Sequence, residues 1–124
     1  MPEWTADDLT RIGHAEELTI AARRPDGSLR SAVPIWVVRV GDDLFVRSYR
    51  GRSGGWFRHA LERHEAHISA GGVDRDVAVE EPAESGHAQI DQAYRDKYSR
   101  FGDAYVLPMV APEAAAASLR LLPR

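Results

Sequence analysis

The segment Gly41–Gly71 constrains the fold of this chain most strongly, because signals for a turn, a strand, a loop and a helix follow one another without a break. Gly41-Asp42-Asp43 is typical of a tight turn, and Leu44–Ser48 has the length and composition of a strand. An Arg- and Gly-rich loop comes next, followed by a short helix headed by Trp56 and a further strand anchored by Ile68. This order predicts a hairpin-rich, mainly β fold in which a loop and a helix start lie at the end of a strand.

Positive charge is concentrated in the same segment. Five arginines and one glutamate lie between Arg47 and Arg63 and give +4, whereas the whole chain carries −3, so the remaining residues carry −7. A compact positive site on an acidic protein favours a small anionic ligand over nucleic acid or a membrane surface, which need a broader basic face. Glycines let backbone N–H groups approach an anion, and guanidinium groups and a helix start attract it. The alternative is a solvated surface loop.

The rest of the chain predicts helices around a β-rich centre. A capping box at Thr5–Asp8 predicts a short N-terminal helix, and the apolar spacing from Ile90 to Phe101 predicts another. Further strands are predicted at 17–24, 29–40, 73–79 and 119–122, with a turn at 25–28 and an irregularity near 74–76. The N-terminal helix is predicted to stop at Gly13, and another helix is predicted after Pro112.

The strand predicted for Leu29–Val40 is unusual because its centre, Val33–Val38, is apolar on both faces. Such a strand is covered on both sides, as in a barrel wall or a subunit interface. Pro34 cannot donate to a ladder, so one side of the chain at that point is an edge, a bulge or open to a ligand. We therefore expect a homodimer.

Composition sets the remaining limits. The chain has 124 residues, 44% of them hydrophobic and 28% charged, which predicts one globular domain spanning 1–124. It has no cysteine, so disulfides, thiol nucleophiles and thiolate metal sites are excluded. No segment has the pattern of a membrane span or a signal peptide, and we expect a cytoplasmic protein.

The order of these motifs resembles the split β-barrel of the pyridoxamine phosphate oxidase-like flavin-binding superfamily. The resemblance implies an α+β, mainly β fold: a six-stranded antiparallel split β-barrel with short peripheral helices. It also implies FMN or a deazaflavin coenzyme as cofactor. The residues that match phosphate-binding positions are Ser48, Arg50, Arg52 and Ser53, with Arg47 beside them, and those that match the ring-lining strand are Val33, Pro34, Ile35 and Trp36.

Three further features are similar to the deazaflavin-dependent nitroreductase branch: the Gly54-Gly55 loop, the helix led by Trp56, and the tyrosine-rich run Ala93–Tyr98. The pattern over the full chain looks most like a small uncharacterised bacterial family that shares this barrel. The chain departs from the superfamily in lacking the usual phosphate-binding lysine. It also has Ala60-Leu61 and His64-Glu65 in place of the Asn-Leu and Asn-Pro landmarks.

Several aromatic residues have two interpretations. Trp36 and Trp56 suit stacking on a planar heterocycle, but large aromatics more often serve packing. Tyr94 and Tyr98 are candidates for lining a substrate pocket, and Lys97 is a candidate proton donor. The alternative is that the two tyrosines form the apolar face of their helix, with Lys97 in water.

The histidines do not predict a metal site. His59, His64 and His67 lie on one segment, but their spacing crosses from helix to strand and no carboxylate motif accompanies them. No catalytic residue is identified. The two functional hypotheses are an oxidoreductase that transfers hydride from a flavin or deazaflavin to a small organic acceptor, and a non-catalytic split-barrel protein that binds a small anionic or planar ligand.

Overall fold

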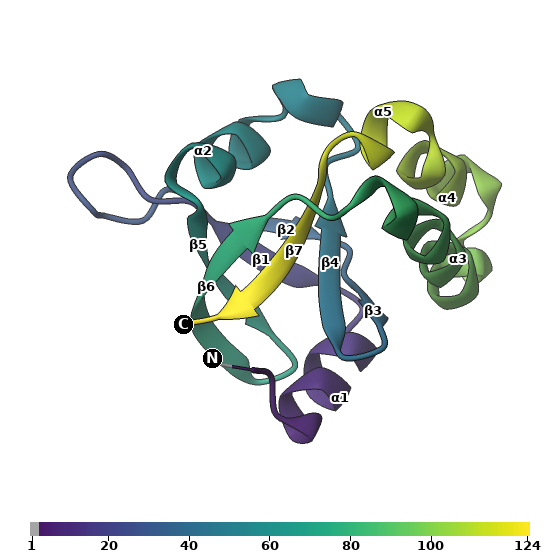
Figure 1. Ribbon diagram of the computed structural model, residues 1–124, viewed down its shortest axis with the longest axis horizontal. Coiled ribbons are helices and arrows are strands. Elements are labelled where there is room, and N and C mark those ends of the chain that lie inside the picture. Colours follow the sequence, from purple (N-terminus) through teal and green to yellow (C-terminus); the bar gives the residue numbers. More distant parts are fainter. Residues whose placement is uncertain (1–2) are drawn as a thin grey trace.

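The computed structural model describes residues 3–124, which form one curled antiparallel sheet with helices around it (Figure 1). The seven strands are β1 (Leu18–Ala21), β2 (Val33–Ile35), β3 (Val38–Val40), β4 (Asp43–Arg47), β5 (Glu65–Ala70), β6 (Val73–Glu80) and β7 (Ser118–Pro123). The helices are α1 (Ala6–His14), α2 (Gly55–Arg63), α3 (His87–Tyr98), α4 (Asp103–Val110) and α5 (Pro112–Ala115), with 3-10 turns at Gly51–Ser53, Glu84–Gly86 and Ser99–Phe101.

The strand order, β2-β1-β5-β6-β7-β4-β3, explains the curl. The two edge strands, β2 and β3, are consecutive in the chain and are separated only by Trp36 and Val37. Three Cα-to-Cα steps span at most about 11 Å, so the two ends of a seven-stranded sheet must come close together. The sheet is therefore a half-barrel whose open seam is crossed by Trp36 and Val37.

The predicted six strands are thus corrected to seven, because Leu29–Val40 is not one continuous strand. Its first part pairs with β1 through Val33–Ile35, and its last part pairs with β4 through Val38–Val40. The irregularity predicted near Asp74–Asp76 is also wrong, since β5 and β6 pair in continuous register from Ala70↔Val73 to Glu65↔Ala78.

Local signals placed the helices well. Thr5 caps α1, its side chain accepting a hydrogen bond from the backbone N–H of Asp8 at 3.0 Å. The helix continues through Gly13 to His14, one residue beyond the predicted stop. α3 buries Ile90, Tyr94 and Tyr98 as its spacing predicted. α4 was not predicted, because its sequence is apolar on every side and contains Pro108.

Two apolar cores form on the two faces of the sheet. The larger lies inside the curl and includes Leu18, Ile20, Val46, Ile68 and Leu119. The second lies between the outer side of β3 and β4 and the helices α3 and α4, and it consists of Val38, Phe45, Ile90, Tyr94, Tyr98, Val106 and Met109. In Figure 1 these helices gather beside β4, away from α2. The second core therefore fixes α4 next to the end of β4.

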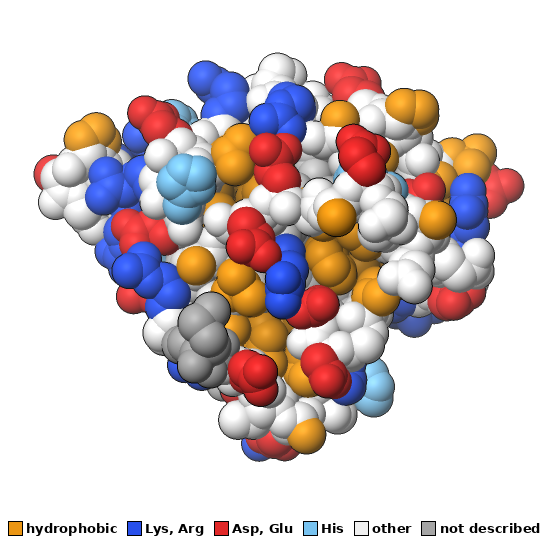
Figure 2. Space-filling model, in the orientation of Figure 1, with side chains coloured by type: hydrophobic (Ala, Val, Ile, Leu, Met, Phe, Trp, Pro, Cys, Tyr) orange, Lys and Arg blue, Asp and Glu red, His pale blue; other side chains and the backbone are white. Residues whose placement is uncertain are grey.

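The visible surface carries mixed charge. Figure 2 shows Lys and Arg side chains interspersed with Asp and Glu on this face, with apolar side chains between them. Among residues 3–124 no helix has both the length and the apolar character needed to cross a membrane.

Candidate functional site

A cavity of about 800 Å³ opens where β2, the end of β4, the start of α2 and α4 meet. This volume is in the range of small-molecule sites. Ten of the residues expected at a cofactor line it: Val33, Pro34, Ile35, Trp36, Arg47, Ser48, Arg50, Gly54, Gly55 and Trp56. The curl of the sheet thus brings the predicted ring-lining strand and the predicted anion loop to a single cavity.

Four of the residues named from the sequence lie elsewhere. Arg52 and Ser53 do not line the cavity, nor do Tyr94 and Tyr98. The cavity also has walls that the sequence did not reveal. These are contributed by Glu17, Tyr49, Ala104, Tyr105, Pro108 and Met109. The α4 residues had no detectable signal, because α4 lacks helical periodicity.

Ser48 provides a polar group at the inner end of the cavity. The residue is 2% exposed, and its hydroxyl has no hydrogen-bond partner within residues 3–124, although its backbone N–H donates to Ala117 O at 3.1 Å. Gly54 faces it so closely that a Cβ there would lie 2.4 Å from Ser48 Oγ. Among the described residues, the fully buried side-chain atoms that lack a partner are Arg30 Nε and Tyr94 Oη, and Ser48 Oγ is not one of them. The Ser48 hydroxyl therefore faces the cavity, where a ligand or solvent can bond to it.

Gly54 is also the N-cap of α2, and no side chain caps this helix. The N–H groups of its first turn therefore carry the positive end of the helix dipole. Gly55 and Trp56, the first residues of α2, line the cavity together with Ser48. The inner end of the cavity is therefore suited to an anion.

Arg50 is the cation best placed to add charge at this end. Its side chain lies over the ring of Tyr49, 5.5 Å from the centroid, and donates to the Tyr49 hydroxyl at 3.1 Å. It makes no ion pair with any carboxylate in the described part of the chain. Both residues are exposed at the rim, so the Arg50 guanidinium is available to a ligand.

Arg47 was expected beside a phosphate, but its guanidinium is occupied within the protein. The residue is 1% exposed. Its Nε donates to Ser118 Oγ at 2.8 Å, and its Nη1 donates to Asp91 Oδ1 at 2.5 Å and to Met109 O at 2.9 Å. Arg47 therefore ties β4 to α3, α4 and β7.

Arg52 points away from the cavity. It pairs with Glu81 and donates to Ala116 O at 2.8 Å, and the hydrogen bond with Glu81 raises the pKa of its guanidinium. The neighbouring Ser53 hydroxyl donates to Arg50 O at 3.1 Å. These two residues hold the loop in shape and do not reach the cavity.

Trp36, at the seam between β2 and β3, also lines the cavity. Its ring is stacked on that of Tyr98, with 3.9 Å between centroids and an angle of 1° between planes. Tyr98 thus lies behind Trp36 and not in the cavity, and burial raises its pKa to about 12. Tyr94 lies in the second core, where its hydroxyl has no partner among the described residues and burial raises its pKa.

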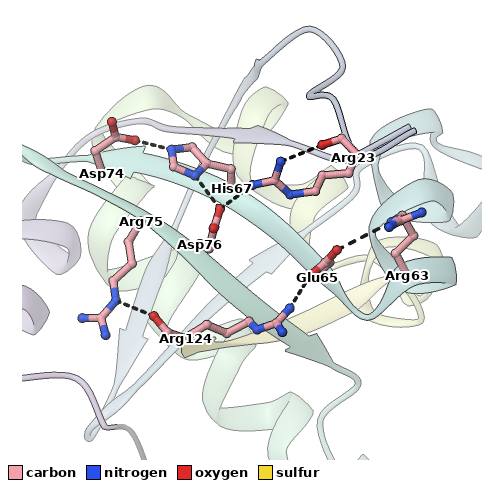
Figure 3. A network of polar contacts seen from close by, with 9 residues as sticks. Arg23, Arg63, Glu65, His67, Asp74, Arg75, Asp76 and Arg124 are labelled. Atoms are coloured by element: carbon pink, nitrogen blue, oxygen red, sulfur yellow. Dashed lines mark hydrogen bonds and ion pairs between the residues drawn. The ribbon is translucent and has the colours of Figure 1, made fainter. Parts of the chain in front are cut away.

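The three histidines are separated. His64 ends α2 with a left-handed backbone, φ 56°, and His67 lies between Asp74 and Asp76 on the surface of the β5–β6 hairpin (Figure 3). Within residues 3–124 no group of three or more His, Asp or Glu side chains converges as a metal site.

The fold and the place of the cavity define a split-barrel protein. Similar solved structures include the heme storage protein HutZ from Vibrio cholerae, with 12% identity and a TM-score of 0.63 over 95% of this chain and 88% of that one. A protein from Listeria innocua assigned as a pyridoxamine 5'-phosphate oxidase has 11% identity and a TM-score of 0.62 over 94% and 90%. An F420 reductase has 13% identity and a TM-score of 0.58 over 94% and 90%.

Residues 8–121 match the model of a family described as an uncharacterized protein conserved in bacteria, DUF2255, and the chain belongs to this family. No curated protein matches its sequence. The resemblance to the split-barrel superfamily and to a small bacterial family is thereby confirmed.

Proposed function

We propose that the cavity binds a flavin-type coenzyme, with its phosphate at the inner end and its ring against Ile35 and Trp36. The observation that carries this proposal is the Ser48 hydroxyl, which lines the cavity and faces Gly54 at the uncapped start of α2. An anion there would receive hydrogen bonds from the hydroxyl and from backbone N–H groups, and it would be attracted by Arg50.

The charges at the cavity favour FMN over a deazaflavin coenzyme with a longer acidic tail. Arg47 is neutralised by Asp91, and Arg52 by Glu81 outside the cavity. The remaining cation in the lining is Arg50, opposed by the carboxylate of Glu17. One guanidinium and one helix start match a single phosphate group.

The lining is less suited to heme. Heme iron in proteins is held by His, Cys, Met or Tyr, and among the lining residues only Tyr49, Tyr105 and Met109 belong to these types. A bound flavin would supply hydride transfer to a small organic acceptor. The protein's own part is to hold the phosphate, to order the ring and to exclude water with the apolar residues of β2 and α4.

A second copy of the chain is part of the proposal. The rim of the cavity exposes two large side chains, Tyr49 at 60% and Tyr105 at 65%, and Leu107 of α4 is 55% exposed. Pro34 is exposed on the edge strand β2. A dimer that covers this apolar rim would enclose the ring of the coenzyme. Light scattering at micromolar concentration should give the mass of a dimer, and a stable monomer would contradict this part.

Calorimetric titration tests the coenzyme. FMN should bind, and riboflavin, which lacks the phosphate, should bind at least about tenfold more weakly, the effect of one hydrogen bond to a charged group. Arg50→Ala should weaken FMN binding to a similar degree without changing riboflavin binding. Arg58→Ala is the matched control, because this exposed arginine of α2 lies outside the cavity and its side chain has no hydrogen bond or ion pair with the described residues.

Equal affinities for FMN and riboflavin would show that the phosphate makes no favourable contact at the inner end of the cavity. Tight binding of hemin or of the deazaflavin coenzyme, but not of FMN, would contradict the choice of ligand. FMN binding without reduction by a nicotinamide donor would favour the non-catalytic alternative.

A further inference from the structure

The backbone at the open seam is held by two side chains of α3. Val37 lies between the edge strands β2 and β3 and belongs to neither of them. Strand pairing therefore does not satisfy its backbone N–H and C=O groups. Its N–H donates to the Tyr98 hydroxyl at 3.1 Å, and its C=O accepts from Lys97 Nζ at 2.7 Å. Buried backbone groups need such partners, so Lys97 and Tyr98 fix the residue that follows Trp36.

The same two side chains hold the segment between α1 and β1. Lys97 Nζ donates to Ala15 O at 2.6 Å, and Tyr98 Oη donates to Glu16 O at 2.7 Å. Glu17, the next residue, lines the cavity. The end of α3 therefore anchors two separate chain segments, each immediately beside a residue of the cavity wall.

The aromatic stack completes this arrangement. The Tyr98 ring supports Trp36 from behind, and Phe101 packs at 5.6 Å from Trp36 and 6.1 Å from Tyr98. Tyr98 is fully buried, so its ring cannot move without opening the second core. The stacked Tyr98 ring sets the plane of the Trp36 ring, and the hydrogen bonds of Val37 fix the backbone next to Trp36.

We propose that Lys97 and Tyr98 are positioning residues, which touch no ligand but hold Trp36 and Glu17 as the wall at the ring end of the cavity. The effect on ligand affinity rests on the proposed function. The order of the wall itself is a property of the free protein and can be measured without ligand.

The lysine makes this wall sensitive to pH. Within residues 3–124, its ammonium contacts two neutral carbonyl acceptors and the Tyr98 ring, 5.0 Å away, and no carboxylate. The charged groups nearby are Arg100, which is paired with Glu16 at 2.8 Å, and Glu17. Burial, with a smaller contribution from Arg100, lowers the Lys97 pKa to about 8. Opening the wall would expose the ammonium to water and return its pKa toward the usual value of 10.5, so the open form binds the proton more tightly than the closed form. The closed wall therefore becomes more stable as pH rises above 8.

The test measures Trp36 in the free protein by acrylamide quenching of its emission between pH 7 and 9.5. The Trp36 signal is obtained as the difference between each protein and its Trp36→Phe counterpart. Wild type should show a decrease in quenching of about twofold or more as pH rises above 8. Lys97→Met should be quenched strongly at every pH, and the quenching of Lys97→Arg, which stays charged, should not change with pH.

Tyr98→Phe retains the stacked ring but loses the hydroxyl, and it should also raise the quenching of Trp36. Arg95→Met is the control, because Arg95 lies exposed on the same helix and has no hydrogen bond or ion pair with the described residues. Identical quenching profiles for wild type and Lys97→Met would overturn the proposal.

FMN titration of the same proteins separates this inference from the proposed function. Lys97→Met should bind FMN about fivefold or more weakly at pH 7, with Lys97→Arg restoring most of the affinity. If FMN fails to bind wild type, the proposed function is wrong. The quenching result still shows whether Lys97 and Tyr98 hold Trp36 in place in the free protein. If FMN binds Lys97→Met as tightly as wild type, the positioning role is overturned.

Discussion

A Cβ on Gly54 would lie 2.4 Å from Oγ of Ser48, whereas a Cβ on the adjacent Gly55 would meet no heavy atom within 4 Å. Gly54→Ala should therefore displace the Ser48 hydroxyl and weaken FMN binding by about tenfold or more. Gly55→Ala should not displace the Ser48 hydroxyl, and it should stabilise α2 by about 0.5–1 kcal/mol, because alanine is the better helix residue. Calorimetry with FMN and urea denaturation of both variants check this.

The double variant Gly54→Ala with Ser48→Ala shows whether the clash is the cause. It should regain the stability lost in Gly54→Ala, since the Ser48 Cβ is 3.5 Å from the added atom, but not the affinity for FMN. Recovery of FMN affinity in the double variant would exclude the Ser48 hydroxyl as a ligand group.

Arg47→Met should destabilise the fold by about 3–5 kcal/mol in urea denaturation, because removing one partner of a buried ion pair leaves the other uncompensated. In this variant Asp91, Ser118 and the carbonyl of Met109 would each lose the hydrogen bond that they accept from Arg47. Arg47→Met combined with Asp91→Leu should recover part of this loss. If Arg47→Met keeps wild-type stability and loses only FMN binding, Arg47 is a ligand cation instead.

Tyr94→Phe should raise the free energy of unfolding by about 1 kcal/mol, because it removes a buried hydroxyl that has no partner in the described structure. Tyr98→Phe is the matched comparison four residues later on α3. Its hydroxyl bonds to Glu16 and Val37, so this variant should lose stability. Thermal or urea unfolding measures both, and a clear loss of stability in Tyr94→Phe would indicate an unrecognised partner for the hydroxyl.

His67 should make stability depend on pH. Its ring bonds to Asp76 at 2.8 Å and also to Asp74, and Asp76 pairs with Arg23 at 2.9 Å (Figure 3). The hydrogen bond with Asp76 raises the pKa of His67 above its usual value of 6.5, with Asp74 adding to this effect and burial opposing it. The stabilisation is therefore complete below pH 6.5 and is lost as pH rises through the folded-state pKa.

The same hydrogen bond from His67 lowers the pKa of Asp76 below its usual value of 3.8. The stabilisation that Asp76 contributes is therefore lost in the opposite direction, as pH falls through that lowered pKa. Urea midpoints at pH 5.5 and 8.5 test the histidine. His67→Gln should be less stable than wild type at pH 5.5 and nearly equal at pH 8.5, with His59→Gln as the control. A stability difference that does not change with pH would contradict this assignment.

The sequence predicted features that depend on near neighbours. Thr5 and Asp8 are three residues apart, and Pro112 begins α5 through its own fixed backbone angle. The loop that lines the cavity was also recognisable as a candidate site, because Ser48, Gly54 and Gly55 lie within one short segment. Signals of this kind require no knowledge of the sheet order.

The remaining features depend on contacts between distant residues. Nothing within Leu29–Val40 shows that the chain crosses a seam at Trp36, because this follows from where β5, β6 and β7 insert. Arg47 resembles a surface cation in the sequence, but its partners Asp91, Met109 and Ser118 lie 44, 62 and 71 residues later. Arg52 was assigned to a phosphate for the same reason, and its partner Glu81 is 29 residues away.

The position of β7 has a consequence for how the chain folds during synthesis. β7 lies between β6 and β4 (Figure 1), pairing Val79 with Leu121 on one side and Leu44 with Leu121 on the other. It leaves the ribosome after all six strands that it joins, so the nascent chain holds two separate sheet fragments, β2-β1-β5-β6 and β4-β3, each with an unpaired inner edge. Until Ser118–Pro123 emerges, these edges are open to pairing with other chains.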